Sequence, residues 1–293
     1  MPPPAPRRGP MLASQTSLHH PHEVNKPIIS RLLAVAATLL PLLSHADWLE
    51  RQQPLAHAVH VPKNYDPAKK YPLAVVIHGN GVQGNDNRPY KSEPFATYLA
   101  TPEVQDKCPH FLYVPQCPAG QKWVDSPWER GSYSVDQVAA SAPLKNLVDT
   151  LRGLLKEFSI DQRRIYLLGI SMGGQATWDL LCRYPGVFAG AVPMAGCGDP
   201  SKAGLLKEVA IWAFHGANDP TVPVTSDREI MAGLDRAGAK VTRLTDLDPP
   251  ARPTATHIYS EYQVGHNVWD KAIALKGQVV PWLFTQTRPP RAP

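Results

Sequence analysis

The chain of 293 residues contains 30 Lys and Arg against 25 Asp and Glu, a net charge of +5, and 43% of its residues are hydrophobic. Residues 1–46 hold four basic residues and one acidic residue, a net of +3, so the rest of the chain carries only about +2. This weak charge, without a basic patch or an aromatic stacking motif, argues against nucleic acid as a partner. The apolar content suffices for one large core, and α/β folds of about 200–250 residues are commonly single domains.

The first 46 residues have the features of an export signal. Arg31 precedes LLAVAATLLPLLSHA, an apolar stretch that ends with Ser44 and Ala46 at the −3 and −1 positions of a cleavage site. A membrane anchor needs about 20 apolar residues, whereas this stretch is shorter and contains a proline. We therefore expect cleavage after Ala46 and a secreted or periplasmic protein with no stable membrane anchor. The segment ahead of Arg31 is long for a signal peptide, which favours a downstream translation start.

Predicted strands and helices alternate along the rest of the chain, which indicates an α/β fold with a mostly parallel central sheet and helices on both faces. Strands are expected at 57–61, 73–77, 111–114, 164–168, 190–193, 209–214, 241–244 and 258–263. Helices are expected at 94–100, 143–158, 174–184, 226–237 and 269–275. The sequence after Thr285 is rich in Pro and Arg and predicts disorder, so we place one domain at 47–288 and a disordered tail at 289–293.

Residues 164–174 read RIYLLGISMGG, an apolar run that ends in the pattern G-x-S-x-G around Ser171. A helix-compatible segment, QATWDLLCRY, follows at once. In a nucleophile elbow the serine occupies a tight turn between a strand and a helix, and glycines flank it because a β-carbon there would collide with both. The pentapeptide alone is weak evidence, and an ordinary Gly-rich turn is the alternative. With a strand before it and a helix after it, the motif predicts that Ser171 is a nucleophile.

A serine hydroxyl needs a base to take its proton, and the base needs an acid that holds it in one tautomer. In the order serine, acid, histidine, the candidates are Asp219 in VAIWAFHGANDPTVPV and His266 in HIYSEYQVGHNVWD. Each follows the carboxyl end of a predicted strand, where open α/β sheets place their sites. Asp219 could instead start a turn, because Pro220 follows it, and His266 could be a solvated loop residue. The rivals that fit this order less well are Asp246, Asp248, His78, His215 and His257.

Acyl transfer also needs two donors for the oxyanion of the tetrahedral intermediate. One donor is expected to be the backbone N–H of Met172, the residue after the nucleophile. The other is expected from the loop that follows the strand at 73–77, and we assign it to the N–H of Asn80, with Gly81 next in order. His78 is expected to hold this loop in place by a hydrogen bond.

Five blocks of the sequence, in order, resemble the esterase branch of the α/β-hydrolase superfamily: PLAVVIHGNGVQGNDN, FLYVPQCP, RIYLLGISMGGQATWDLLCRYPGVFAGAVPMAGCGD, IWAFHGANDPTVPV and VGHNVW. The chain resembles bacterial phospholipase/carboxylesterase-like proteins, also labelled predicted peptidases, and more distantly feruloyl esterases and polyhydroxybutyrate depolymerases. The resemblance assigns the nucleophile to Ser171, the acid in HGxxDxxVP to Asp219 and the base in GHxxW to His266. It implies hydrolysis of a small-molecule or polymer-linked ester by a serine carboxylesterase, without a metal or an organic cofactor.

Two segments depart from the family pattern and affect substrate choice. A proline-rich insertion, DLDPPARPTATH, lies between two predicted strands, and a polar loop, PAGQKWVDSPWERGSYSVDQ, carries Trp123 and Trp128. These tryptophans are expected to bind substrate by stacking, with bracing of a long loop as an equal alternative. A serine peptidase of the same fold and a non-catalytic binding module are the alternative functions. Four cysteines, which could pair as disulfides or remain buried thiols, are Cys108, Cys117, Cys182 and Cys197.

Overall fold

The computed structural model describes Met1, residues 47–246 and residues 254–289. The predicted export signal, most of the proline-rich insertion and residues 290–293 lie outside the described residues. Within the described ranges, nine strands form one sheet in the order β1-β2-β4-β3-β5-β6-β7-β9-β8. The strands are β1 (Asp47–Arg51), β2 (His57–Val61), β3 (Tyr71–Ile77), β4 (Phe111–Pro115), β5 (Ile160–Ile170), β6 (Gly190–Met194), β7 (Ala210–Gly216), β8 (Val241–Leu244) and β9 (His257–Tyr262).

The sheet is parallel from β4 to β8, and only β2 pairs antiparallel with its neighbours β1 and β4. The prediction of a mostly parallel α/β sheet is therefore confirmed. Its α-helices are α1 (Pro89–Ser92), α2 (Pro94–Leu99), α3 (Pro102–Gln105), α4 (Ala142–Glu157), α5 (Met172–Arg183), α6 (Thr225–Arg236), α7 (Trp269–Ala274) and α8 (Lys276–Thr285). Short 3₁₀ turns are η2 (Asn80–Val82), η3 (Trp128–Arg130) and η4 (Pro200–Leu206). No helix of the described segments is long and apolar enough to cross a membrane.

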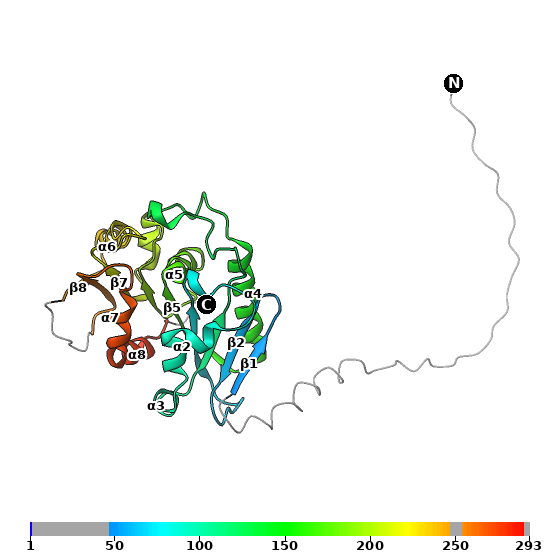
Figure 1. Ribbon diagram of the computed structural model, residues 1–293. Coiled ribbons are helices and arrows are strands. Elements are labelled where there is room, and N and C mark those ends of the chain that lie inside the picture. Colours follow the sequence, from blue (N-terminus) through cyan, green and yellow to red (C-terminus); the bar gives the residue numbers. More distant parts are fainter. Residues whose placement is uncertain (2–46, 247–253, 290–293) are drawn as a thin grey trace, which may run out of the picture. The chain divides into compact units, whose positions relative to one another are not determined.

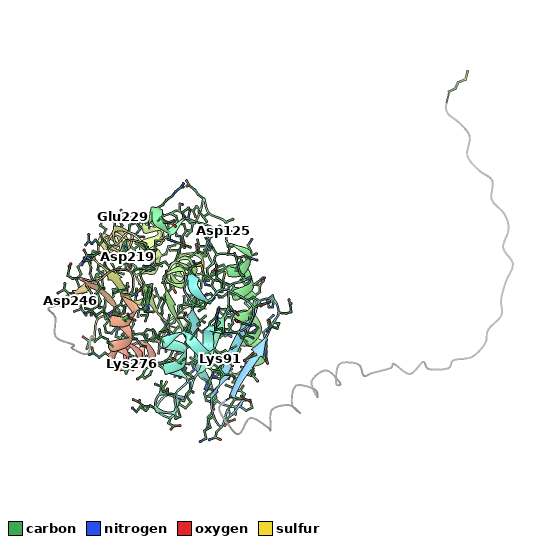
Figure 2. The ribbon with its side chains drawn as sticks, viewed as in Figure 1. Lys91, Asp125, Asp219, Glu229, Asp246 and Lys276 are labelled. Atoms are coloured by element: carbon green, nitrogen blue, oxygen red, sulfur yellow. The ribbon has the colours of Figure 1, made fainter. Side chains whose placement is uncertain are left out.

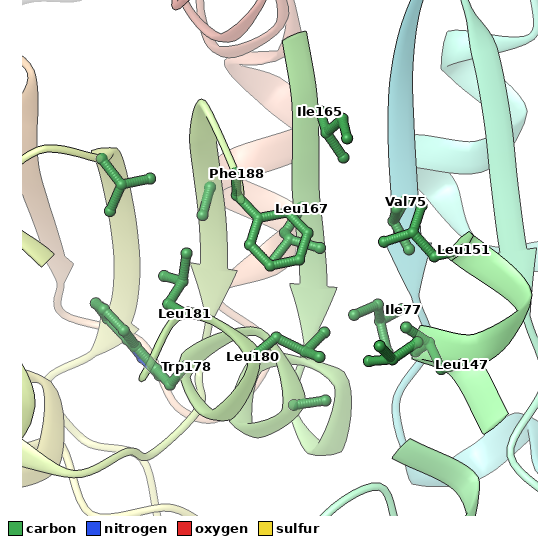
Figure 3. Close-up of a cluster of buried hydrophobic side chains, with 14 of the residues drawn as sticks. Val75, Ile77, Leu147, Leu151, Ile165, Leu167, Trp178, Leu180, Leu181 and Phe188 are labelled. Carbon is green, nitrogen blue, oxygen red and sulfur yellow. The ribbon is translucent and has the colours of Figure 1, made fainter. Parts of the chain in front are cut away.

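Two apolar layers enclose the sheet, because alternate residues of a strand point to opposite faces. Leu73, Val75 and Ile77 of β3 pack with side chains of α4, α5 and α6 in one layer, part of which Figure 3 shows. Ala74 and Val76 of the same strand pack with α2, α3, α7 and α8 in the other layer. Figure 1 shows α4 and α5 beside the central strands and α7 with α8 at the lower left. Helices thus cover both faces, as the alternating elements predicted.

Three parts of the fold differ from the sequence-based expectation. β1 pairs with β2 and was not expected, since its short segment DWLER is charged and partly exposed. α8 was also not expected, since it contains Pro281, but it buries Val279, Val280, Trp282 and Leu283 against the sheet. The expected disorder directly after Thr285 is wrong, because the Arg288 N–H donates to the Arg163 carbonyl of β5 at 3.0 Å.

Candidate active site

Ser171 lies between β5 and α5 in a backbone conformation that few side chains adopt. Its φ is 55° and its ψ is −116°, and its N–H donates to the Met194 carbonyl at the end of β6 at 2.8 Å. A positive φ at a residue with a side chain is uncommon and typical of functional positions that the surrounding structure holds in place. The strand, the tight turn and the helix match the geometry of a nucleophile elbow.

The flanking glycines explain why the turn can be so tight. A β-carbon on Gly169 would lie 2.1 Å from the carbonyl oxygen of Gly173, and one on Gly173 would lie 2.0 Å from the carbonyl oxygen of Ile77. Both contacts are with backbone atoms, which cannot rotate away as a side chain can. The first turn of α5 therefore packs directly on the ends of β3 and β5, and Ser171 is held at the carboxyl edge of the sheet.

His266 and Asp219 meet Ser171 at this edge from two other loops. The Nε2 atom of His266 is 2.8 Å from Ser171 Oγ, and the Nδ1 atom of His266 is 2.7 Å from Asp219 Oδ2. Asp219 follows β7 and His266 follows β9, and these strands are neighbours in the sheet. Figure 2 labels Asp219 on the side of the molecule where Figure 1 places α6. An ionised Asp219 accepts a hydrogen bond from Nδ1–H of His266. The other ring nitrogen, Nε2, then carries no proton and can take the proton of the Ser171 hydroxyl.

The Asp219 carboxyl is set up to stay ionised. Its Oδ1 atom accepts the backbone N–H groups of Thr221 at 2.8 Å and Val222 at 3.0 Å. Burial alone would raise its pKa, but hydrogen bonds from His215, His266 and these two N–H groups hold the pKa of Asp219 well below its usual range. The Asp219 carboxylate is therefore ionised at neutral pH.

The rival acids and bases that the structure describes have partners other than Ser171. Asp246 accepts the Gln263 N–H at 2.6 Å and contacts Lys271 Nζ at 3.1 Å, while Asp248 lies outside the described residues. His257 begins β9, at the end of the strand opposite to His266, and its Nε2 is 3.3 Å from the Leu206 carbonyl. His215 is buried beside Asp219 and makes no contact with Ser171. The structure thus brings together the three residues that the motif order selected.

The loop after β3, from which the second oxyanion donor is expected, lies close to Ser171. A β-carbon on Gly79 would be 3.3 Å from the Ile170 carbonyl and 3.5 Å from the Ser171 β-carbon. Asn80 begins η2 and is exposed, and Met172 begins α5, where the first N–H groups of a helix have no intrahelical acceptor. Apart from bonds inside helices and strands, no backbone hydrogen bond of the described residues uses the N–H of Asn80 or of Met172.

His78 anchors this loop in a single neutral tautomer. The Cys117 N–H donates to His78 Nε2 at 2.9 Å, so that nitrogen carries no proton and Nδ1–H donates to the Gly79 carbonyl at 2.6 Å. Burial lowers the pKa of His78 to about 4, which keeps the ring neutral. The expected structural role of His78 matches this geometry.

The two tryptophans of the polar loop have different surroundings. Trp123 is fully buried, its indole N–H donates to the His78 carbonyl at 3.2 Å, and its ring packs edge-on against that of His78. Trp123 therefore braces the loop after β3, which favours the bracing alternative over stacking on a substrate. Trp128 is only partly buried in η3, with Lys122 Nζ 4.3 Å above its ring. Trp128 remains a candidate for stacking on a substrate.

The cysteines and the acidic groups suggest no additional reactive centre. The four cysteines are all free thiols, and Cys117, Cys182 and Cys197 are buried. Burial raises the pKa of Cys117 to about 12 and that of Cys182 to about 12, so both remain protonated and unreactive. Within the described ranges, no three His, Cys, Asp or Glu side chains are grouped so that they could hold a metal ion.

Glu93, the residue before α2, has a buried carboxyl that no sequence motif singles out. It is 7% exposed and its Oε2 atom has no hydrogen-bond partner. Burial raises the pKa of Glu93 to about 7, although a hydrogen bond from the Gly79 N–H opposes the shift. Glu93 therefore supports the loop that carries Asn80, at the cost of burying a carboxyl group.

We expect Glu93→Gln to stabilise the protein above about pH 7. Between the ordinary pKa of 4.5 and the raised value of about 7, the folded chain keeps a proton that the unfolded chain releases. The free energy of unfolding therefore falls as the pH rises through this window, and the substitution should restore up to about 3 kcal/mol above it. Urea unfolding at several pH values measures this, with Glu103→Gln, at a largely exposed carboxyl, as the matched control. Equal pH dependence in the Glu93 variant and the wild type would contradict the expectation.

Comparisons with known proteins agree with this fold. No model of a known protein family matches the sequence. A curated bifunctional acetylxylan esterase/xylanase from Neocallimastix patriciarum is 26% identical over 173 residues, which are 58% of this chain and 22% of that protein. The crystal structure of a thermostable esterase is 30% identical, with a TM-score of 0.67, and the match covers 83% of this chain and 63% of that one.

A ferulic acid esterase structure is 15% identical with a TM-score of 0.57, over 82% of this chain and 97% of that one, a likeness that shows the fold alone. This chain spans less than two thirds of the length of the acetylxylan esterase/xylanase and of the thermostable esterase. Taken with the strand order, these similarities show that the chain has an α/β-hydrolase fold, as its motifs predicted.

Proposed function

We propose that the chain is a serine carboxylic-ester hydrolase that acts through Ser171, His266 and Asp219. The observation that carries the proposal is the continuous hydrogen-bonded path from Ser171 Oγ to His266, at 2.8 Å, and on to Asp219, at 2.7 Å. These residues are far apart in the sequence, and each follows a different strand at one edge of the sheet. A nucleophile, a base within hydrogen-bond reach and a group that orients the base together define this reaction class.

The reaction follows from the atoms in place. His266 Nε2 takes the Ser171 proton as Oγ attacks the ester carbonyl carbon, and the oxygen of the tetrahedral intermediate accepts the N–H groups of Met172 and Asn80. The intermediate collapses when His266 gives its proton to the departing alcohol, which leaves an acyl group on Ser171. Water then attacks the acyl carbon with His266 as base, and a second collapse releases the acid and restores the serine. Asp219 stays ionised throughout and stabilises the His266 imidazolium.

The proposal includes export. Residues 1–46 would be removed as a signal peptide, leaving a hydrolase domain of residues 47–288 that acts outside the cytoplasm. Mass spectrometry of the protein exported by its native host checks the cleavage site, because a mature N-terminus at Asp47 is expected. Another mature N-terminus, or retention of the whole leader, would contradict this part of the proposal.

The function is tested with a panel of substrates. We expect the purified protein to hydrolyse p-nitrophenyl acetate, p-nitrophenyl butyrate or methyl ferulate, and a fluorophosphonate to label Ser171 in a one-to-one ratio, as peptide mapping would show. Cleavage of a peptide anilide without ester turnover would favour the serine peptidase. Neither turnover nor labelling of Ser171 would refute the hydrolase and favour a binding module.

A further inference from the structure

A second buried charge cluster lies directly behind Asp219. It consists of His215 at the end of β7 and Asp227 in the first turn of α6, and both side chains are 0% exposed. Buried ionisable groups are costly unless they are paired and hydrogen-bonded. The proposed reaction does not use either residue, so their burial beside the acid of the site needs an explanation.

The partners of His215 indicate that its ring is doubly protonated. His215 Nδ1 is 2.8 Å from Asp227 Oδ2, while His215 Nε2 is 3.0 Å from the Val222 carbonyl and 3.4 Å from Asp219 Oδ2. All three partners are acceptors, so each ring nitrogen carries a proton and the Nε2 proton is shared between two oxygens. Burial alone would lower the pKa of His215, but the Asp227 charge and the hydrogen bonds to Asp219 and Asp227 raise it to about 10.

The same cluster connects the loop after β7 that carries Asp219, here called the acid loop, to α5, the helix that follows Ser171. Asp227 Oδ1 accepts the indole N–H of Trp178 at 2.8 Å, and Trp178 is a fully buried residue of α5. Since α5 begins immediately after Ser171, the polar contacts form a closed path from Ser171 through His266, Asp219, His215, Asp227 and Trp178 back to α5. A displacement of the acid loop relative to the nucleophile helix would break at least one of these contacts.

We propose that His215, held by Asp227 as a buried imidazolium, is a positioning residue that fixes the Asp219 carboxylate for its interaction with His266. This inference rests on the proposed function, because it assigns Asp219 the role of orienting the base. A positioning pair and a purely structural ion pair differ in how their loss affects the folded enzyme. Loss of a structural pair lowers stability alone, whereas loss of a positioning pair also slows the chemical step.

The charge on His215 also acts on the Asp219 carboxyl. The hydrogen bond from His215 helps to hold the pKa of Asp219 below its usual range, so removal of this buried cation moves that pKa upward. Other titratable and charged groups face His215 or Asp227: Asp219, Glu261 opposite His215 on β9, Arg228 paired with Glu261 at 2.6 Å, Tyr259 and Cys197. Arg228 pairs with Glu261 and offsets its charge, so Glu261 does not compete with Asp219 for the charge on His215. His215 itself contacts Asp219.

The test compares His215→Gln and Asp227→Asn with His257→Gln, a substitution at another buried histidine that lies at the far end of β9. We expect the first two variants to lower kcat by about 10- to 100-fold with KM changed by less than about threefold, because small misplacements of a catalytic group have effects of this size. The acid limb of kcat/KM should also move to higher pH. The His257 variant should keep kcat and the pH profile even where it lowers the melting temperature.

A second readout separates this inference from the proposed function. The rate at which a fluorophosphonate labels Ser171 reports the reactivity of the serine without any ester substrate, and it should fall in both cluster variants. Normal labelling, kcat and pH profile in folded His215→Gln and Asp227→Asn would overturn the positioning role and leave the hydrolase intact. If the wild type is labelled but hydrolyses no ester, the proposed function fails while labelling still tests the cluster. If His215→Gln does not fold, Asp227→Asn, which is nearly isosteric, decides the question.

Discussion

We expect Ser171→Ala to lower kcat for ester hydrolysis by about 10⁴- to 10⁶-fold and leave the melting temperature within a few degrees of the wild type. The substitution removes the Oγ atom that bonds to the acyl carbon. No acyl-enzyme can then form, although His266 and the N–H groups of Met172 and Asn80 remain in place. What remains is the stabilisation of an oxyanion from water attack, which accounts for a residual rate. Ser171 lies in the elbow with its side chain toward His266, and loss of one hydroxyl there removes little packing.

The measurement is initial-rate hydrolysis of the best ester of the panel, with protein concentration taken from absorbance and folding of each variant checked by circular dichroism. Ser92→Ala, at an exposed serine of α1, is the matched control and should keep full activity. Near-normal turnover by folded Ser171→Ala would show that another group is the nucleophile. Loss of activity in both variants would indicate a preparation that does not fold.

Local sequence patterns predicted the parts of the fold that depend on local chemistry. The strand, the glycines and the helix around Ser171 could be read directly, because the motif is one short continuous stretch of chain in which Gly169 packs on Gly173. β1 and α8 could not, because their stability comes from partners distant in sequence. β1 pairs along its whole length with β2, and α8 contains a proline but buries four apolar side chains against the sheet.

The candidate site was predictable where chemistry and chain order coincide. Asp219 and His266 each follow a strand in the order that the hydrolase mechanism requires, and the structure places His266 against Ser171 and Asp219 against His266. His215 stands four residues before Asp219 in the sequence, where the motif order makes it only a rival base. Its partner Asp227 could not be found, since an acidic residue in the first turn of a helix is common and favourable in itself. Glu93 is similar, because nothing local indicates that its carboxyl is buried.

We expect Gly173→Ala to lower the free energy of unfolding by at least about 4 kcal/mol. The added β-carbon would lie 2.0 Å from the Ile77 carbonyl oxygen, 2.6 Å from its carbon and 2.8 Å from the His78 carbonyl oxygen. All three are backbone atoms of β3 and the oxyanion loop, so relief requires moving α5 away from the sheet. Costs above about 4 kcal/mol are exceptional for one substitution and need a mechanism of this kind.

Gly153→Ala is the matched control because it makes the same chemical change in another helix. Gly153 is exposed in α4, and a β-carbon there meets no atom within 4 Å. Since alanine is preferred to glycine inside a helix, this variant should be more stable than the wild type by about 0.5–1 kcal/mol. Urea unfolding of both variants measures the two effects with opposite signs. A Gly173 variant as stable as the wild type would mean that α5 does not rest on the carboxyl end of β3, and the elbow would then lose the contact that holds Ser171 in its strained conformation.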